Sequence, residues 1–264
     1  MLKLENVTKV FNPGTINEKT ALEDLSLDVK DGDFITIIGA NGSGKSTLFN
    51  CVAGSFITDK GRIVLDGEDV TLTPEHIRAR NIGRLFQDPL SGTAPHLTVL
   101  ENLALAAQSG GWLSTITRED KKRFTDALQE LDMGLEERLD SEVGLLSGGQ
   151  RQALTLIMAT INPPKLLLLD EHTAALDPGS AAKVLEITRK IVEEGRLTCL
   201  MVTHNMQQAL DLGNRLIMMN GGSIVVDLDS EEKKKTSVED LLALFKKAAG
   251  EELLNDRVLL STNE

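Results

Sequence analysis

The sequence predicts an α/β protein with a largely parallel sheet and helices on its faces. Apolar runs within residues 34–38, 165–170 and 197–203 each fit a strand that is buried on both faces. Helical patterns at 178–194 and 205–212 separate the later runs. This alternation of strands and helices is typical of a parallel sheet.

Antiparallel strands are expected to accompany this sheet. Residues 2–7 and 21–29 alternate apolar and polar side chains, as half-buried strands do. A third strand is expected within 61–70, with a turn at Asp66 and Gly67.

The middle of the chain has helical spacing from about residue 96 to residue 160. Thr98 is the predicted N-cap of the first helix, and Glu101 three residues later completes a capping box. A second amphipathic helix is expected from about residue 118.

The C-terminal part is expected to add a hairpin and a terminal helix. Residues 215–219 fit a strand, and Asn220-Gly221 is a hairpin signal that joins it to the next apolar run. The charge run at 231–235 is expected to be a solvated linker. Residues 237–249 have an amphipathic pattern, which predicts a helix that docks back on the core.

Composition narrows the function classes. The chain has 264 residues, enough for one large domain or for a core with a smaller subdomain. Its 28 basic and 40 acidic residues give a net charge of −12, whereas a nucleic-acid-binding protein usually has a basic face. We therefore expect no nucleic acid partner.

Targeting signals and cysteines point to a soluble, cytoplasmic protein. The N-terminus lacks the apolar run of a signal peptide, and no apolar stretch approaches the ~20 residues of a membrane span. Cys51 and Cys199 lie in apolar stretches and fit buried free thiols in a reducing compartment.

Residues 39–47 match the phosphate-loop pattern G-x-x-x-x-G-K-[ST]. A glycine-rich turn without a ligand would also fit the pattern, but the position between a buried strand and a helix favours a phosphate site. Backbone amides and the helix N-terminus would bind the β-phosphate. Lys45 would neutralise the β- and γ-phosphates, and the Ser46 hydroxyl is placed to bind Mg²⁺. Mg²⁺ and a nucleotide with β- and γ-phosphates are therefore the expected ligands of this loop. The expected nucleotide-binding residues of the loop are Gly39, Asn41, Gly42, Ser43, Gly44, Lys45, Ser46 and Thr47.

Two acidic residues end the apolar run before residue 172. Asp170 at the end of a buried strand is expected at the carboxyl edge of the sheet, where ligands bind, and would join the Mg²⁺ shell. Glu171 projects differently and is a candidate to orient an attacking water. Such a pair is as often a surface turn, but the phosphate loop favours a site. His204 and Gln87 also follow apolar runs, and each is a weak signal alone.

A second polar turn, Leu-Ser-Gly-Gly-Gln at 146–150, precedes an apolar helix. Ser147, Gly148 and Gly149 open that helix with backbone amides, which is a way to hold an anion. No lysine follows these glycines, so the segment is not a second phosphate loop.

In this order, the motifs resemble those of the nucleotide-binding subunits of ABC transporters over nearly the whole chain. The matching segments are the phosphate loop, Gln87, the signature at 146–150, Asp170-Glu171, Ala-Leu-Asp at 175–177, and His204. The resemblance implies a P-loop NTPase core of the RecA-like type with an antiparallel β subdomain and a helical ABC subdomain. It implies one ABC ATPase domain at 1–229, a helical subdomain at about 88–160, and a helical tail at 230–264.

The resemblance also implies roles for individual residues. The signature residues Ser147, Gly148, Gly149 and Gln150 would contact the γ-phosphate of ATP that is bound to a partner chain. Glu171 and His204 would be catalytic, with Asp170, Ser46 and Gln87 at the metal. Asp177 would couple the two sites. Phe11 would stack on adenine, although a strand-end or core phenylalanine is the alternative.

The partners implied are a second copy of the chain across two ATP molecules, an integral membrane permease, and a periplasmic or lipoprotein substrate-binding protein. The expected location is the cytoplasmic face of the cell membrane, with the helical subdomain docked on the permease. The expected activity is transport-coupled ATP hydrolysis.

One position departs from the family pattern. His172 follows Glu171, where proline is common. The segments around it resemble subunits of bacterial tryptophan or tyrosine uptake systems, relatives of branched-chain amino-acid importers, which favours an amino acid or related solute as cargo. The alternatives are a non-transport ABC ATPase, a catalytically silent regulatory ABC module, and a small-molecule kinase that would leave the signature unexplained.

Overall fold

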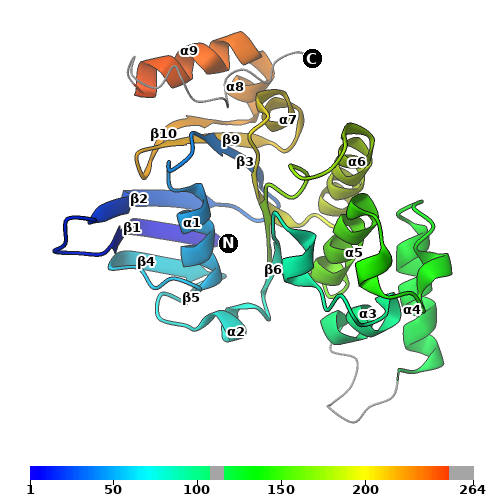
Figure 1. Ribbon diagram of the computed structural model, residues 1–264. Helices are drawn as coiled ribbons and strands as arrows, with labels where there is room; N and C mark the ends of the chain where they lie inside the picture. The colour runs from blue at the N-terminus through cyan, green and yellow to red at the C-terminus, as the bar shows by residue number, and fades with distance from the viewer. Residues whose placement is uncertain (108–115, 250–264) are drawn as a thin grey trace. The chain divides into compact units, whose positions relative to one another are not determined.

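The computed structural model describes residues 1–107 and 116–249 (Figure 1). They form two compact units: unit 1 joins Met1–Ile82 to the chain from Leu197 onward, and unit 2 is Gly83–Arg196. Residues 108–115 of the predicted helical subdomain and 250–264 of the predicted tail lie outside the described residues. Among those described, no helix is both long and apolar enough to cross a membrane.

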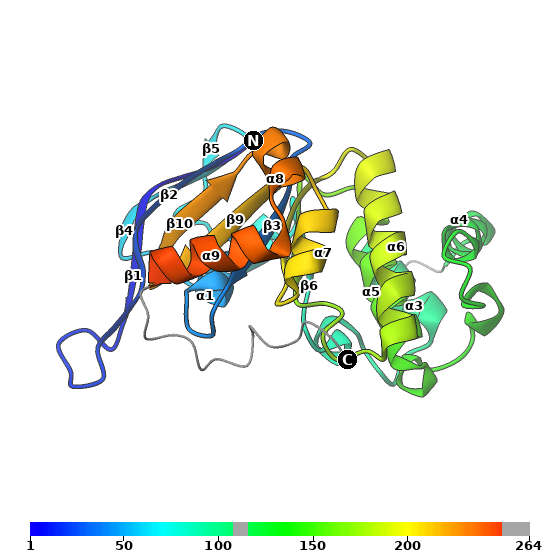
Figure 2. The same cartoon turned by 90° about the horizontal axis from the view of Figure 1, so that it is seen from above.

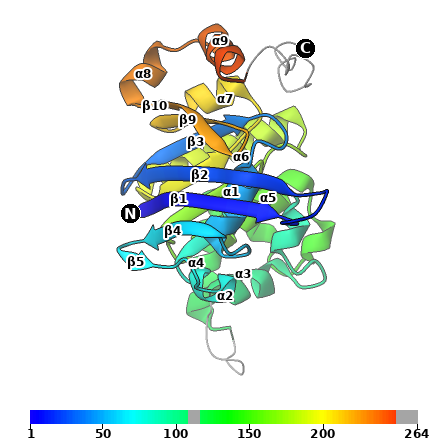
Figure 3. The same ribbon diagram turned by 90° about the vertical axis from the view of Figure 1, so that its left-hand side faces the viewer.

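Unit 1 contains the predicted antiparallel sheet, with strand order β2-β1-β4-β5 (Figure 3). Its strands are β1 (Leu2–Phe11), β2 (Lys19–Val29), β4 (Lys60–Leu65) and β5 (Glu68–Asp69). Alternate side chains of β2 are buried from Leu25 to Val29, as the sequence predicts for a half-buried strand. The turn at Asp66 and Gly67 is confirmed, and both residues have positive φ, 52° and 81°.

The second sheet of unit 1 has the order β10-β9-β3-β8. Its strands are β3 (Phe34–Gly39), β8 (Thr198–Val202), β9 (Arg215–Asn220) and β10 (Ser223–Leu228). All six residues of β3 are buried, and β3 pairs in parallel with both β8 and β9. Helices α1 (Lys45–Ala53), α2 (Glu75–Arg78) and α7 (Met206–Asp211) also belong to this unit. The parallel sheet predicted from the continuous apolar runs is therefore confirmed.

The C-terminal hairpin forms, but its turn is one residue later than predicted. Asn220 is paired with Ser223, so the two turn residues are Gly221 and Gly222. Their φ values are 54° and 83°, and a two-residue turn of this kind needs positive φ at both positions. Glycine adopts that conformation at less cost than asparagine, and Asn220 therefore stays in the strand.

The charge run at 231–235 is not a solvated linker. It lies in helix α8 (Ser230–Lys235), where Lys233 is buried and donates to the carbonyl oxygens of Leu212 and Gly213. Helix α9 (Val238–Ala249) follows and lies along β9 and β10, as the amphipathic pattern predicts (Figure 2). The linker prediction was wrong because a continuous run of charges cannot reveal that one lysine points inward.

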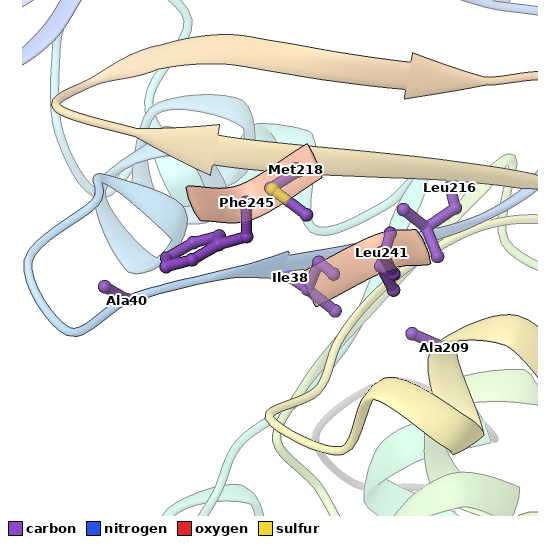
Figure 4. Close-up of a cluster of buried hydrophobic side chains, with 7 residues drawn as sticks. All are labelled: Ile38, Ala40, Ala209, Leu216, Met218, Leu241 and Phe245. Atoms are coloured by element: carbon purple, nitrogen blue, oxygen red, sulfur yellow. The ribbon is translucent and has the colours of Figure 1, made fainter. Parts of the chain in front are cut away.

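The buried side chains of α9 complete a hydrophobic cluster of unit 1. Leu241 and Phe245 pack with residues of β3, β9 and α7 (Figure 4). The other buried members of this cluster are Ile38, Ala40, Ala209, Leu216 and Met218. The tail up to residue 249 is thus part of the core of unit 1.

Unit 2 contains most of the predicted helices. They are α3 (Val99–Ala107), α4 (Arg118–Gln129), α5 (Gly148–Thr160) and α6 (Pro178–Glu194). The strands of this unit are β7 (Leu166–Asp170) and, apart from its first residue, β6 (Ile82–Leu85). Three single turns of 3₁₀ helix accompany them: η1 (Pro89–Gly92), η2 (Glu136–Arg138) and η3 (Val143–Leu145). The capping box at Thr98 and Glu101 is confirmed, because the Glu101 amide donates to the Thr98 hydroxyl and the Glu101 carboxylate accepts from the Thr98 amide.

A buried arginine closes the C-terminal end of α1. Arg78 is 2% exposed, and its guanidinium donates to the carbonyl oxygens of Cys51 and Val52 at 2.8 and 2.9 Å. It also donates to two carbonyls of the loop before α2. The last carbonyls of a helix have no intrahelical partner, so Arg78 supplies the missing donors.

We predict that Arg78→Met lowers the free energy of unfolding by about 3 kcal/mol, because several buried carbonyls lose their donors at once. Urea denaturation followed by far-UV circular dichroism measures this change. Arg80→Met is the matched control, since Arg80 is exposed and a surface change of this kind shifts stability by less than about 0.5 kcal/mol. Equal midpoints for the two variants would contradict the role given to Arg78.

Candidate functional site

The phosphate loop leaves β3 by a turn that only glycine fits. Gly39 has φ 156°, and a Cβ there would lie 2.3 Å from the carbonyl oxygen of Met219. Gly44 has φ 105°, and a Cβ there would lie 2.5 Å from the carbonyl oxygen of Ala21. Both glycines are therefore required by close approach of the backbone as well as by their φ.

The loop offers donors to an anion. Helix α1 begins at Lys45, its N-cap Gly44 makes no side-chain cap, and its first turn contains no acidic residue. The amides of this first turn have no intrahelical acceptor, which is the arrangement that binds phosphate. Ser46 is exposed, and the Ser43 hydroxyl is buried without a hydrogen-bond partner in the described chain. These features fit a phosphate group bound above the loop.

Lys45 is held over the same loop. Its ammonium is buried, with the side chain 5% exposed, and it donates to the carbonyl oxygens of Gly39 and Ala40 at 2.7 and 3.1 Å. These bonds keep the positive charge at the mouth of the loop, where it can exchange carbonyl acceptors for phosphate oxygens.

His204 emerges at the same sheet edge as the phosphate loop. Ile37 of β3 pairs in parallel with Val202 of β8, and the amide of Thr203 donates to the carbonyl of Ile37 at 3.2 Å. The loop that follows β3 and the half-buried His204 that follows β8 therefore leave the sheet in the same direction.

Phe11 ends β1 and already has aromatic and cationic neighbours. Its ring meets that of Phe56 edge to face, with centroids 5.4 Å apart, and Lys9 lies 5.7 Å from the ring centroid. The ring is half-buried, which is compatible with both readings of this residue: a surface for adenine and a packed strand end.

In unit 2, Asp170 ends β7 and Glu171 follows in a left-handed conformation with φ 46°. Non-glycine residues rarely adopt this conformation, and such strain is concentrated at functional sites. Gln87 lies two residues beyond β6 and is exposed. Within residues 1–107 and 116–249, no group of three or more His, Cys, Asp or Glu side chains could hold a metal ion.

The signature turn is a capped helix start. Ser147 is the N-cap of α5, and its hydroxyl accepts from the Gln150 amide while the Gln150 side chain accepts from the Ser147 amide, both at 3.2 Å. The side-chain amide of Gln150 also donates to the carbonyl of Met133. Gln150 thus shapes the turn from within its own chain.

The two signature glycines have different surroundings. Gly148 is exposed, whereas Gly149 is buried, and a Cβ on Gly149 would lie 2.8 Å from the Ser180 side chain. Gly149 therefore lets α5 pack closely on the start of α6. Asp177, the N-cap of α6, accepts from the Ser180 amide at 3.0 Å, and hydrogen bonds from Ser180 lower the pKa of Asp177.

His172 is a buried residue whose environment the sequence did not reveal. It is 1% exposed, and its Nε2 lies 3.0 Å from the hydroxyl oxygen of Thr188 in α6. That hydroxyl donates to the Val184 carbonyl at 2.8 Å, so it accepts from His172, which carries its proton on Nε2. The bond ties the segment after Glu171 to α6. Burial lowers the pKa of His172 to about 4.

A phosphate loop between a buried strand and a helix, in an α/β core with an antiparallel sheet, defines a P-loop NTPase. The family model described as ABC transporter matches residues 22–174. The chain therefore belongs to the ABC transporter family, as an ATP-binding protein that hydrolyses ATP.

Known relatives agree with this assignment. The chain is 44% identical over 250 residues to a tyrosine transport ATP-binding protein of Clostridioides difficile, which covers 94% of this chain and 100% of that protein. It is 34% identical over 249 residues to the phosphonates import ATP-binding protein PhnC of Lactococcus lactis, covering 91% and 98% of the two chains.

Solved structures of ATP-binding cassettes are also similar. One is a dimeric post-hydrolysis state of MJ0796 bound to ADP and Pi, with a TM-score of 0.75, 30% identity, and 87% and 99% of the two chains covered. Another is a nucleotide-free cassette from an ABC transporter, with a TM-score of 0.76, 28% identity, and coverage of 93% and 98%. The predicted P-loop NTPase fold is confirmed.

We predict that His172 makes folding stability sensitive to acid. Its pKa is about 4 when folded and 6.5 as the ordinary value, so the unfolded chain binds the extra proton, and stability falls as the pH drops below 6.5 towards 4. The loss from this residue between pH 7 and pH 5 is about 2 kcal/mol.

Urea denaturation at both pH values, in metal-free buffer, measures the loss in the natural protein and in His172→Gln. Residue 172 of the variant cannot titrate, so between pH 7 and pH 5 the free energy of unfolding of His172→Gln should fall by about 2 kcal/mol less than that of the wild-type protein. Identical losses in the two proteins would show that His172 is not a buried neutral histidine.

Proposed function

We propose that the protein is the ATP-binding and ATP-hydrolysing subunit of a bacterial importer for an amino acid or a related small solute. The observation that carries the proposal is the loop from Gly39 to Lys45, with its uncapped helix start and buried ammonium. The similarity to a tyrosine transport protein over that relative's full length supports an amino acid as the cargo.

ATP would bind with its phosphates on this loop. The first-turn amides of α1 would hold the β-phosphate, and Lys45 would neutralise the β- and γ-phosphates. Phe11 is our candidate for the adenine contact. Asn41, Gly42 and Thr47 would complete the nucleotide-binding set.

Mg²⁺ would bind together with the nucleotide. This ion is usually held by one or two carboxylates with substrate phosphates and water, rather than by a full protein cage. This coordination preference does not require a group of three His, Cys, Asp or Glu side chains, and the described residues contain none that could hold a metal ion. Ser46, Asp170 and Gln87 are the proposed ligands, and the ion would neutralise phosphate charge.

The signature turn would act on ATP bound to a second copy of the chain. Ser147 and Gly148 are exposed at the start of α5, where helix amides face outward without a lysine beside them. A γ-phosphate that is already neutralised by the partner's Lys45 needs only such amides. ATP would therefore hold two copies together, an arrangement supported by the dimeric state of the similar cassette MJ0796.

Hydrolysis would use Glu171 and His204. Glu171 would polarise the attacking water, and His204 would contact the γ-phosphate and help to orient that water. Asp177, at the start of α6, would couple the two ATP sites. Gln87 would report the nucleotide state to the membrane subunit.

The transport cycle would also require a membrane permease and a substrate-binding protein, either periplasmic or a lipoprotein. The helical segment at about 88–160 would dock on the permease at the cytoplasmic face of the membrane. Rigid-body rotation on dimer closure would transmit the nucleotide state to the permease.

We predict that Glu171→Gln retains ATP binding and lowers steady-state ATP hydrolysis by about 10²–10⁴-fold, because the neutral amide cannot take a proton from water. Phosphate release and an equilibrium nucleotide titration measure the two properties. Glu137→Gln, at an exposed position of the same unit, should retain both. Hydrolysis above about a tenth of the natural rate would exclude Glu171 as the main base.

We predict that Ser147→Arg abolishes ATP-driven dimerisation and leaves ATP binding to the monomer unchanged. The bulky side chain would fill the space reserved for the partner's γ-phosphate without touching the nucleotide of its own chain. In the Glu171→Gln background, size-exclusion chromatography with ATP should show a dimer, and the double variant should remain a monomer of equal ATP affinity.

Loss of the Ser147 cap costs about 1 kcal/mol, so a thermal melt of the monomer must first show that the double variant is folded. A dimer of the double variant, or a strong fall in its monomer affinity, would mean that the signature is not at the interface or acts on the ATP of its own chain.

A further inference from the structure

Helix α7 begins at Met206, two residues after His204, and is only six residues long. Isolated helices of this length are not stable in water, so α7 depends on its neighbours. The turn around His204 belongs to this helix: the Asn205 side chain accepts from the Gln208 amide at 3.0 Å, and the Thr203 hydroxyl accepts from the Asn205 amide at 3.1 Å. Whatever holds α7 therefore fixes the backbone on both sides of His204.

Lys233 of α8 holds the C-terminal end of α7. Its buried ammonium donates to the carbonyl of Leu212, which follows the last turn of α7, and to that of Gly213 at 3.2 Å. Burial lowers the pKa of Lys233 to about 8, and the nearby Asp211 opposes this shift. A cation at the C-terminal end of a helix also interacts favourably with the helix dipole. The lysine is thus a buried clamp on a helix end.

Helix α9 and strand β3 hold the flanks of α7. Leu241 of α9 packs in one cluster with Ala209 of α7 (Figure 4). The Thr36 hydroxyl of β3 donates to the carbonyl of Ala209 at 2.8 Å. Helix α7 is therefore fixed by the strand that leads into the phosphate loop and by the C-terminal segment.

We propose that the C-terminal helices α8 and α9 are a positioning element for His204, with Lys233 and Leu241 as its positioning residues. The inference rests on the proposed role of His204 in hydrolysis. The two residues act through α7 and do not contact the nucleotide. Residues 231–235, which the charge pattern assigns to a linker, would thus influence the rate of ATP hydrolysis.

The test compares Lys233→Met with Lys235→Met in the full-length chain. Methionine retains most of the buried aliphatic volume and removes the donor, and Lys235 is an exposed lysine of the same helix. We expect Lys233→Met to lower kcat about tenfold, less than the ~10²-fold cost of a 1 Å misplacement. The affinity for ATP should not change, and amide hydrogen exchange of residues 206–211 should become faster. Lys235→Met should resemble the natural protein in all three measurements.

A second variant, Leu241→Ala, loosens α7 from its other side and should also lower kcat and speed hydrogen exchange of α7 without changing the affinity for ATP. It serves as the test if Lys233→Met is poorly folded. Each variant is then combined with His204→Ala. Because both residues act through His204, they should lower kcat no further in that background.

The outcomes separate the two claims. If His204→Ala alone has the same kcat as the wild-type protein, the proposed role of His204 in hydrolysis is overturned. Suppose instead that His204→Ala lowers kcat. Unchanged amide hydrogen exchange of α7 in Lys233→Met and Leu241→Ala would then overturn only the positioning role. The positioning role would also be overturned if Lys233→Met or Leu241→Ala still lowered kcat tenfold in the His204→Ala background, because the effect would then not pass through His204.

Discussion

The close approach of the backbone where β3 turns into α1 is the constraint on which the nucleotide site depends. Gly39 lies against the carbonyl of Met219 in β9, and Gly44 lies against that of Ala21 in β2. A strand from each of the two sheets of unit 1 therefore fixes one end of the loop. Its amides are in place before a ligand arrives, so little free energy is lost in ordering them when phosphate binds.

The signature turn achieves a similar result with different contacts. A reciprocal cap between Ser147 and Gln150 shapes the turn, and Gly149 lets its helix approach Ser180 at a distance that no other residue allows. Only part of the motif is therefore exposed to a ligand. The rest supports the exposed amides, much as the bond from His172 to the following helix supports the segment next to the strained Glu171.

Two buried cations of unit 1, Arg78 and Lys233, each donate to carbonyl oxygens at the end of a helix. A buried charge is costly unless its hydrogen bonds are made. Such groups therefore disfavour any arrangement of the chain that buries the charge without acceptors.

The sequence by itself determined the class of fold and the position of the phosphate loop. Continuous apolar runs and the spacing of glycines before Lys45 are local signals, and β3 and α1 form where these signals place them. The hairpin turn was misplaced by one residue because two adjacent glycines compete with Asn220 for positive φ. The roles of Lys233 and His172 were decided only by tertiary structure. Each lies in a polar or charged stretch, and its partners are residues distant in the sequence, at the end of α7 and within α6. No periodicity within one segment records which side chain meets a partner that another segment brings to it.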